Sequence, residues 1–186
     1  MGPRYTHAAV GLHWTAAALI LFNLAFGLYL VDLPLSPQKL KYFSWHKWVG
    51  ITVLWLSAAR LAWRLAHPAP ALPASVPGWE RAAAHASHAL LYLLFFAVPI
   101  TGWLFSSAAG FPVVYLGVPA LTLPDLVDKN KELADLLKAA HRWLNYGLAS
   151  LVALHIAAAI KHHVLDADDV LARMLPFLKP SPGNEP

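Results

Sequence analysis

The chain has 186 residues, of which 58% are hydrophobic and 13% are charged, and its net charge is +4. A typical soluble domain has about 25% charged residues, so this composition argues against such a domain and against intrinsic disorder. The chain has no cysteine, which excludes disulfides, thiolate metal sites and covalent c-type haem. It has no long basic run, so nucleic acid is not a predicted partner.

The first predicted element is a membrane-spanning helix over residues 5–31, a stretch without Asp, Glu, Lys or Arg. A bilayer core of about 30 Å requires roughly 20 helical residues, so this stretch is long enough to span it. A second span is predicted over residues 44–66. Its core is free of charge, and the long basic side chains near its ends can reach the membrane interface.

A third span is predicted over residues 82–105, in which Pro99 and Gly102 favour a kink. An apolar, turn-rich loop and an amphipathic segment from Asp125 precede the fourth span, over residues 139–163. The tail after Asp166 is polar and is expected to carry little function. The whole chain, 1–186, is therefore predicted to be one all-α membrane domain, a four-helix bundle.

Four spans place both ends of the chain on one side of the bilayer. Lys and Arg residues are divided equally between the two sides, so the positive-inside rule does not orient the bundle.

Four histidines match in depth. His13 lies about eight residues into the first span, and His155 lies about eight residues before the end of the fourth. Because these helices run in opposite directions, both side chains reach the same level. His46 and His141 lie near the starts of the second and fourth spans, on the opposite side of the membrane, and they also match.

His141 and His155 are 14 residues apart, so they lie on nearly the same face of one helix, about 21 Å apart in height. Two opposed histidines can supply both axial ligands of a haem iron inside a four-helix bundle. Two such sites stacked across the bilayer predict a path for electrons. The alternatives are histidines that only pack helices together, a divalent metal site, or a His-lined proton or metal transporter.

Other polar residues near the first pair are weaker candidates. His88 could replace one of the ligands, contact a haem propionate or hydrogen-bond a quinone. Arg60 and Arg64 are one turn apart and could bind propionates through forked hydrogen bonds, although anchoring to lipid phosphate explains them equally well. His85, His162 and His163 are expected at the interface.

Several short motifs resemble the bacterial cytochrome b561 family along nearly the whole chain. They are, in order, Leu12-His13-Trp14, Trp45-His46-Lys47 with Gly50, Arg60-Leu61-Ala62-Trp63-Arg64, His85-Ala86-Ser87-His88 with Leu91-Tyr92, Pro99-Ile100-Thr101-Gly102, His141, Leu154-His155, Lys161-His162-His163 and Arg173-Met174-Leu175. Each piece is short, but the ordered set is specific.

The resemblance implies a membrane cytochrome with two haem b groups, one held by His13 and His155 and the other by His46 and His141. It also implies a multi-pass protein of the bacterial inner membrane with cytoplasmic termini. One branch of the family oxidises superoxide at the outer face and reduces ubiquinone, and a chain of this length resembles that branch. Protons for the quinol would then pass through His88, His162 or His163. Other branches are cytochrome b subunits that exchange electrons between quinone and a redox protein partner.

Three lysines, Lys39, Lys41 and Lys47, lie in or next to the first connection, beside His46, with Asp32 as the only acid of that loop. If the substrate is an anion such as superoxide, these lysines would raise its local concentration and its rate of encounter. Lipid-phosphate anchoring and solubility are the alternative explanations.

Overall fold

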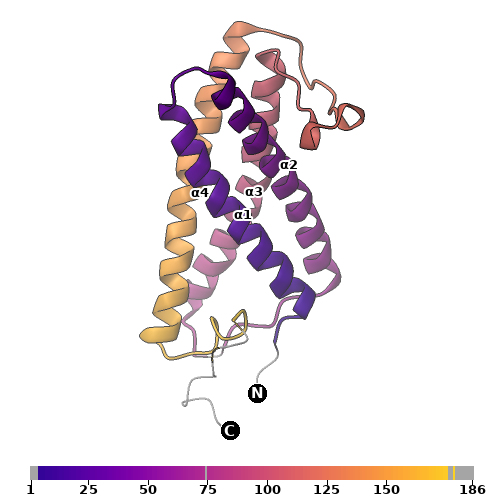
Figure 1. Cartoon of the computed structure of the whole chain (residues 1–186). Helices are drawn as coiled ribbons and strands as arrows, with labels where there is room; N and C mark the ends of the chain where they lie inside the picture. Colours follow the sequence, from indigo (N-terminus) through magenta and orange to yellow (C-terminus); the bar gives the residue numbers. More distant parts are fainter. Residues whose placement is uncertain (1–3, 74, 176–177, 179–186) are drawn as a thin grey trace.

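Four long helices form the computed structural model, which describes residues 4–73, 75–175 and 178 (Figure 1). They are α1 (His7–Asp32), α2 (Pro37–Ala66), α3 (Gly78–Ala108) and α4 (Lys131–Val164). Two short 3₁₀ turns, η1 (Tyr115–Gly117) and η2 (Pro119–Leu121), lie between α3 and α4. The described residues contain no strand beyond an isolated bridge between Val114 and Thr122, which confirms the all-α fold class.

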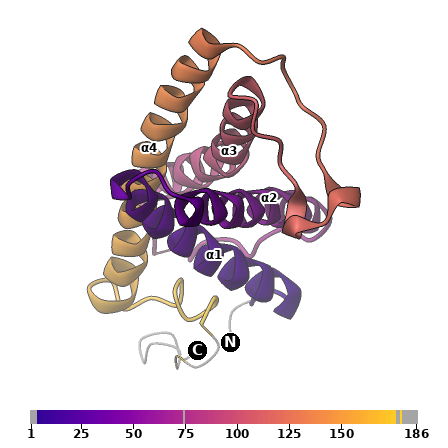
Figure 2. The ribbon, with the colours of Figure 1, turned by 45° about the horizontal axis from the view of Figure 1, so that its top comes forward.

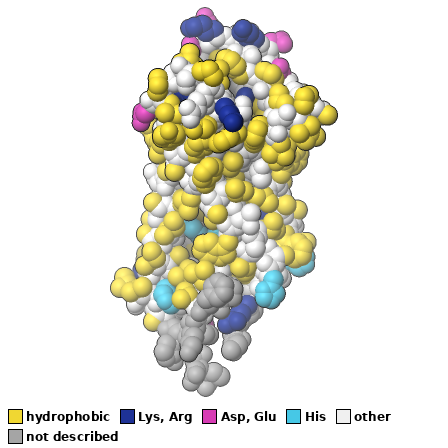
Figure 3. All heavy atoms as spheres, viewed as in Figure 1, with side chains coloured by type: hydrophobic (Ala, Val, Ile, Leu, Met, Phe, Trp, Pro, Cys, Tyr) yellow, Lys and Arg dark blue, Asp and Glu magenta, His cyan; other side chains and the backbone are white. Residues whose placement is uncertain are grey.

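Each helix is long and apolar enough to cross a membrane, with mean hydropathies of 1.9, 1.3, 1.9 and 1.5 in chain order. Charged side chains gather toward the ends of the face shown in Figure 3, and hydrophobic side chains dominate between them. Large apolar side chains on the outside, such as Trp55 and Leu93, are more than 60% exposed. In a bilayer these side chains face lipid, so the protein is a membrane-embedded four-helix bundle.

Three of the helices, α2, α3 and α4, begin earlier than the predicted spans, and side-chain caps extend two of them, α2 and α4, beyond the apolar stretches. Ser36 accepts a hydrogen bond from Lys39 N at 3.2 Å, and Pro37 occupies the first turn of α2. Asn130 caps α4 in the same way, accepting from Leu133 N at 2.9 Å. The third helix runs through Pro99 without interruption.

Neighbouring helices are antiparallel, and α1 packs on α2, α2 on α3, and α3 on α4. A buried apolar cluster fills the middle of the bundle; it consists of Ala16, Ile20, Val53, Leu91, Phe95 and Leu148. On α4, Leu148 lies halfway between His141 and His155. The cluster therefore separates two interior regions, one at each end of the bundle.

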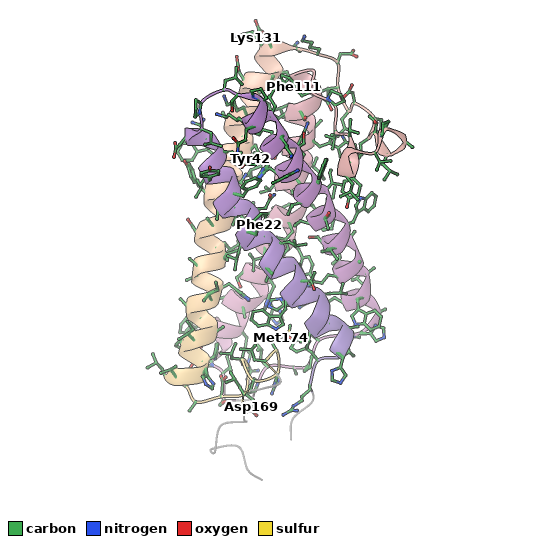
Figure 4. The ribbon with its side chains drawn as sticks, viewed as in Figure 1. Phe22, Tyr42, Phe111, Lys131, Asp169 and Met174 are labelled. Atoms are coloured by element: carbon green, nitrogen blue, oxygen red, sulfur yellow. The ribbon has the colours of Figure 1, made fainter. Side chains whose placement is uncertain are left out.

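These two ends are named here by the helix termini that they contain. The "terminal end" is where α1 begins and α4 ends, and the "loop end" is where α2 and α4 begin (Figure 1). At the terminal end the described part of the tail folds back against the bundle. Trp14 donates to Met174 O at 2.8 Å, Arg173 donates to Ala71 O at 2.7 Å, and Asp168 is 6% exposed. This part of the tail thus belongs to the packed structure, and Met174 and Asp169 are seen at that end in Figure 4.

Candidate functional site

His13 of α1 and His155 of α4 face each other inside the terminal end. Their ring centroids are 6.4 Å apart, and the ring planes cross at 66°. His13 and His155 are called the "terminal-end pair" below. His88 of α3 lies beside this pair, with its ring centroid 5.4 Å from that of His155. The pairing expected from depth is therefore present, and the third histidine lies beside it.

His46 of α2 and His141 of α4 form the equivalent "loop-end pair". Their ring centroids are 6.3 Å apart and their planes cross at 87°. When two imidazoles bind one metal ion from opposite sides, each with a metal–nitrogen distance of about 2 Å, their ring centres lie roughly 6 Å apart. Both pairs therefore have the spacing that axial ligands of one iron require.

Each ring of the loop-end pair packs against a glycine of a neighbouring helix, where the absence of a side chain leaves room for it. A Cβ atom added to Gly27 of α1 would lie 3.0 Å from Cε1 of His46, and one added to Gly102 of α3 would lie 3.0 Å from Cε1 of His141. Any side chain at these positions would push on a ring. The sequence analysis assigned Gly102 to a kink, whereas the structure shows that it makes room for an imidazole.

Hydrogen bonding prepares the imidazoles for a ligand. Nδ1 of His141 lies 3.0 Å from Val98 O, so Nδ1 carries the proton and the lone pair of Nε2 is available to a metal. Nδ1 of His13 and Nδ1 of His46 are buried without a hydrogen-bond partner. Such groups are costly in a bilayer interior and are typical of functional sites. The chemistry of these residues therefore fits bound haem.

Two arginines lie close to the terminal-end pair. The guanidinium carbons of Arg60 and Arg64 lie 5.7 and 6.0 Å from the centroid of the Tyr92 ring. All three residues line a small pocket with Tyr5 and His67, and the Tyr92 hydroxyl is buried without a partner. No carboxylate forms an ion pair with either arginine among the described residues. An anionic group such as a propionate would complement this pocket.

His162 has partners that the sequence did not reveal. Its Nδ1 lies 2.7 Å from a carboxylate oxygen of Asp168, and its side chain is only 13% exposed. The adjacent Lys161 bridges Glu80 at 2.9 Å and Asp166 at 2.8 Å. Lys161 pairs with both carboxylates, so these residues form an ion-pair network. Asp168 comes from the tail, and only the fold of the tail brings it to His162.

The three lysines at the loop end have different surroundings. Lys41 is exposed above the Trp45 ring, 5.3 Å from its centroid. Lys39 donates to Leu33 O at the end of α1, where a cation suits the helix dipole. Lys47 is half-buried and points into the bundle, donating to Ser106 Oγ at 3.2 Å, Phe111 O at 3.3 Å and Pro112 O at 3.1 Å. Only Lys41 is thus fully presented to solvent.

Comparison with known proteins agrees with this geometry. Prokaryotic cytochrome b561 is the family that matches, over residues 4–177. The chain is 36% identical to cytochrome b561 homolog 2 of Escherichia coli K12, covering 92% of this chain and 91% of the relative. It is 30% identical to the probable superoxide oxidase CybB of Yersinia pestis, covering 95% and 98%, and 29% identical to cytochrome b561 homolog 1 of Escherichia coli K12, covering 95% and 99%.

These matches define the class as a prokaryotic membrane cytochrome that transfers electrons. The chain belongs to the prokaryotic cytochrome b561 family, which confirms the resemblance drawn from its motifs. Membership implies b-type haem and argues against the His-lined transporter.

The contacts of Lys47 predict that it fastens the loop after α3 to α2. Lys47→Met should remove three hydrogen bonds, so the backbone amides of Phe111, Val113 and Val114 should exchange hydrogen several-fold faster by mass spectrometry. Lys41→Met is the matched control, because the Lys41 ammonium lies over the Trp45 ring of its own helix and makes no hydrogen bond to the loop among the described residues, and it should leave this exchange unchanged. Equal exchange in the wild type and both variants would show that Lys47 does not hold the loop.

Proposed function

We propose that this protein is a di-haem b-type cytochrome that moves electrons across the bacterial inner membrane. The observation that supports this most directly is the presence of two opposed histidine pairs with nearly equal spacing, 6.4 and 6.3 Å, at opposite ends of one bundle. His13 and His155 would hold one haem b, and His46 and His141 would hold the other. When bound, the two haems supply reversible one-electron chemistry.

The chain's own residues set the conditions for that chemistry. Each histidine pair orients its group between two helices, and the apolar cluster around Leu148 and Phe95 keeps water out of the space between the pairs. Arg60 and Arg64 would bind the propionates of the terminal-end haem, in the pocket where they meet Tyr92. His88, beside His155, is placed for a propionate or quinone contact.

We further propose that superoxide is the donor at the loop end and ubiquinone the acceptor, with the chain termini in the cytoplasm. Two superoxide ions would be oxidised to two molecules of dioxygen for each ubiquinone reduced to ubiquinol, with uptake of two protons. His162, whose Nδ1 lies 2.7 Å from Asp168, would relay protons at the terminal end. The name of the Yersinia relative and the near-complete overlap of the two chains support this choice of donor.

The glycine beside His141 provides a test of the loop-end haem site. Gly102→Val should displace the His141 ring, so that this site loses its haem and the ratio of haem to chain falls from two toward one. Gly147→Val on α4 is the matched control, because a Cβ there meets no atom within 4 Å, and it should keep both haems. Pyridine haemochrome absorbance measures the ratio; an unchanged ratio and spectrum in Gly102→Val would contradict the assignment of His141.

Steering of superoxide can be tested with two variants that change the net charge equally. Lys41 is five residues from His46, whereas Lys131 is ten residues from His141 at the far tip of α4. Fields in water are screened over about 8 Å at physiological ionic strength. Lys41→Glu should therefore slow superoxide oxidation several-fold at low salt, and Lys131→Glu should slow it much less. Equal rates in both variants and the wild type, without salt dependence, would favour a redox protein as the partner instead.

A further inference from the structure

The loop between α3 and α4 has an unusual composition for a segment outside the helices. This "outer loop", Phe111–Pro124, contains no Asp, Glu, Lys, Arg or His. Four of its large apolar side chains are exposed: Phe111 at 60%, Leu116 at 56%, Val118 at 43% and Leu121 at 47%. A loop that faced water would be expected to carry polar side chains at such positions.

The outer loop lies against the side of α2 rather than across the top of the bundle (Figures 1 and 2). Trp48 Nε1 donates to Val114 O at 2.7 Å, and the Thr52 hydroxyl lies 2.8 Å from the Tyr115 hydroxyl. Lys47 is the last charged residue before the charge-free stretch 48–59 of α2. Thr52 lies five residues beyond it, about 7 Å further into the membrane-spanning part. The outer loop therefore contacts α2 deeper in the membrane-spanning part than Lys47, the last charged residue at this end of α2.

The outer loop has eleven backbone N–H groups, and five of them donate to carbonyl groups of the same loop. These five are Gly117 to Val114 O at 3.2 Å, Val118 to Tyr115 O at 3.0 Å, Leu121 to Val118 O at 2.9 Å, Thr122 to Pro119 O at 3.2 Å and Leu123 to Val113 O at 2.9 Å. Three more residues are prolines, which have no N–H group. Irregular backbone is costly in hydrocarbon because water cannot pair with it, and these hydrogen bonds, with that of Phe111 N–H to Ser106 O at 2.9 Å, lower that cost for a loop that lies near the headgroup boundary.

From depth, composition and backbone pairing together, we infer that the outer loop is a lipid-binding element inserted into the leaflet at the loop end. Its exposed apolar side chains contact the acyl chains near the headgroup boundary. Because the outer loop carries no charge, it binds the apolar part of neutral lipids and does not depend on anionic headgroups. This inference requires only that the bundle spans the membrane, and it is independent of the proposed donor and acceptor.

The absence of cysteine allows a direct test by labelling a single site. Leu116→Cys, labelled with bimane in phosphatidylcholine nanodiscs, should be quenched by lipids with doxyl at carbon 5. Quenching by aqueous iodide should be several-fold weaker than for the water control, Lys131→Cys, whose native side chain is 91% exposed at the tip of α4. The lipid control is Leu93→Cys, in the middle of α3 and 62% exposed.

Two outcomes would overturn the inference. If iodide quenched the bimane label at position 116 as strongly as the label at position 131, the outer loop would lie in water. If it were shielded from iodide and from doxyl lipids alike, a protein surface would cover it. Leu121→Cys repeats the measurement at a second exposed position, so that a folding defect of one variant leaves the test intact.

Discussion

Four imidazoles inside an apolar bundle need partners, because the bilayer interior has no water to hydrogen-bond to them. The antiparallel helices bring His13 to His155 and His46 to His141, at 6.4 and 6.3 Å between ring centroids, but this approach leaves Nδ1 of His13 and Nδ1 of His46 without a hydrogen-bond partner. Small residues on the neighbouring helices make the approach possible, most clearly Gly102 beside His141. The buried nitrogens that remain without protein partners are consistent with ligand binding, and b-type haem is the ligand that the family implies.

Both ends of the bundle contain a histidine pair, but different polar residues surround the two pairs. At the terminal end, Arg60 and Arg64 line a pocket, and Nδ1 of His162 lies 2.7 Å from Asp168. At the loop end, Lys41 faces solvent while Lys47 fastens the outer loop to α2. The proposed transfer of electrons from a small anion at the loop end to an acceptor at the terminal end would make use of this asymmetry.

The four spans and the depth of the paired histidines could be predicted from the sequence, because helix geometry converts residue spacing directly into height. The caps at Ser36 and Asn130 extend two helices beyond the apolar stretches, which hydropathy alone does not reveal. Contacts between distant segments were also missed. Glu80 meets Lys161 through the packing of α3 on α4, Asp168 meets His162 through the folding of the tail, and Gly102 of α3 lies against His141 of α4. Spacing along one helix carries no information about such contacts.

The proposed electron path requires two haems, each held by two histidines, and the absorption spectrum of the purified wild-type protein tests this most directly. A reduced-minus-oxidised spectrum combined with a haem assay should show low-spin b-type haem with close to two haems per chain. One haem per chain, a high-spin spectrum or a colourless protein would contradict the assignment of the four histidines as axial ligands.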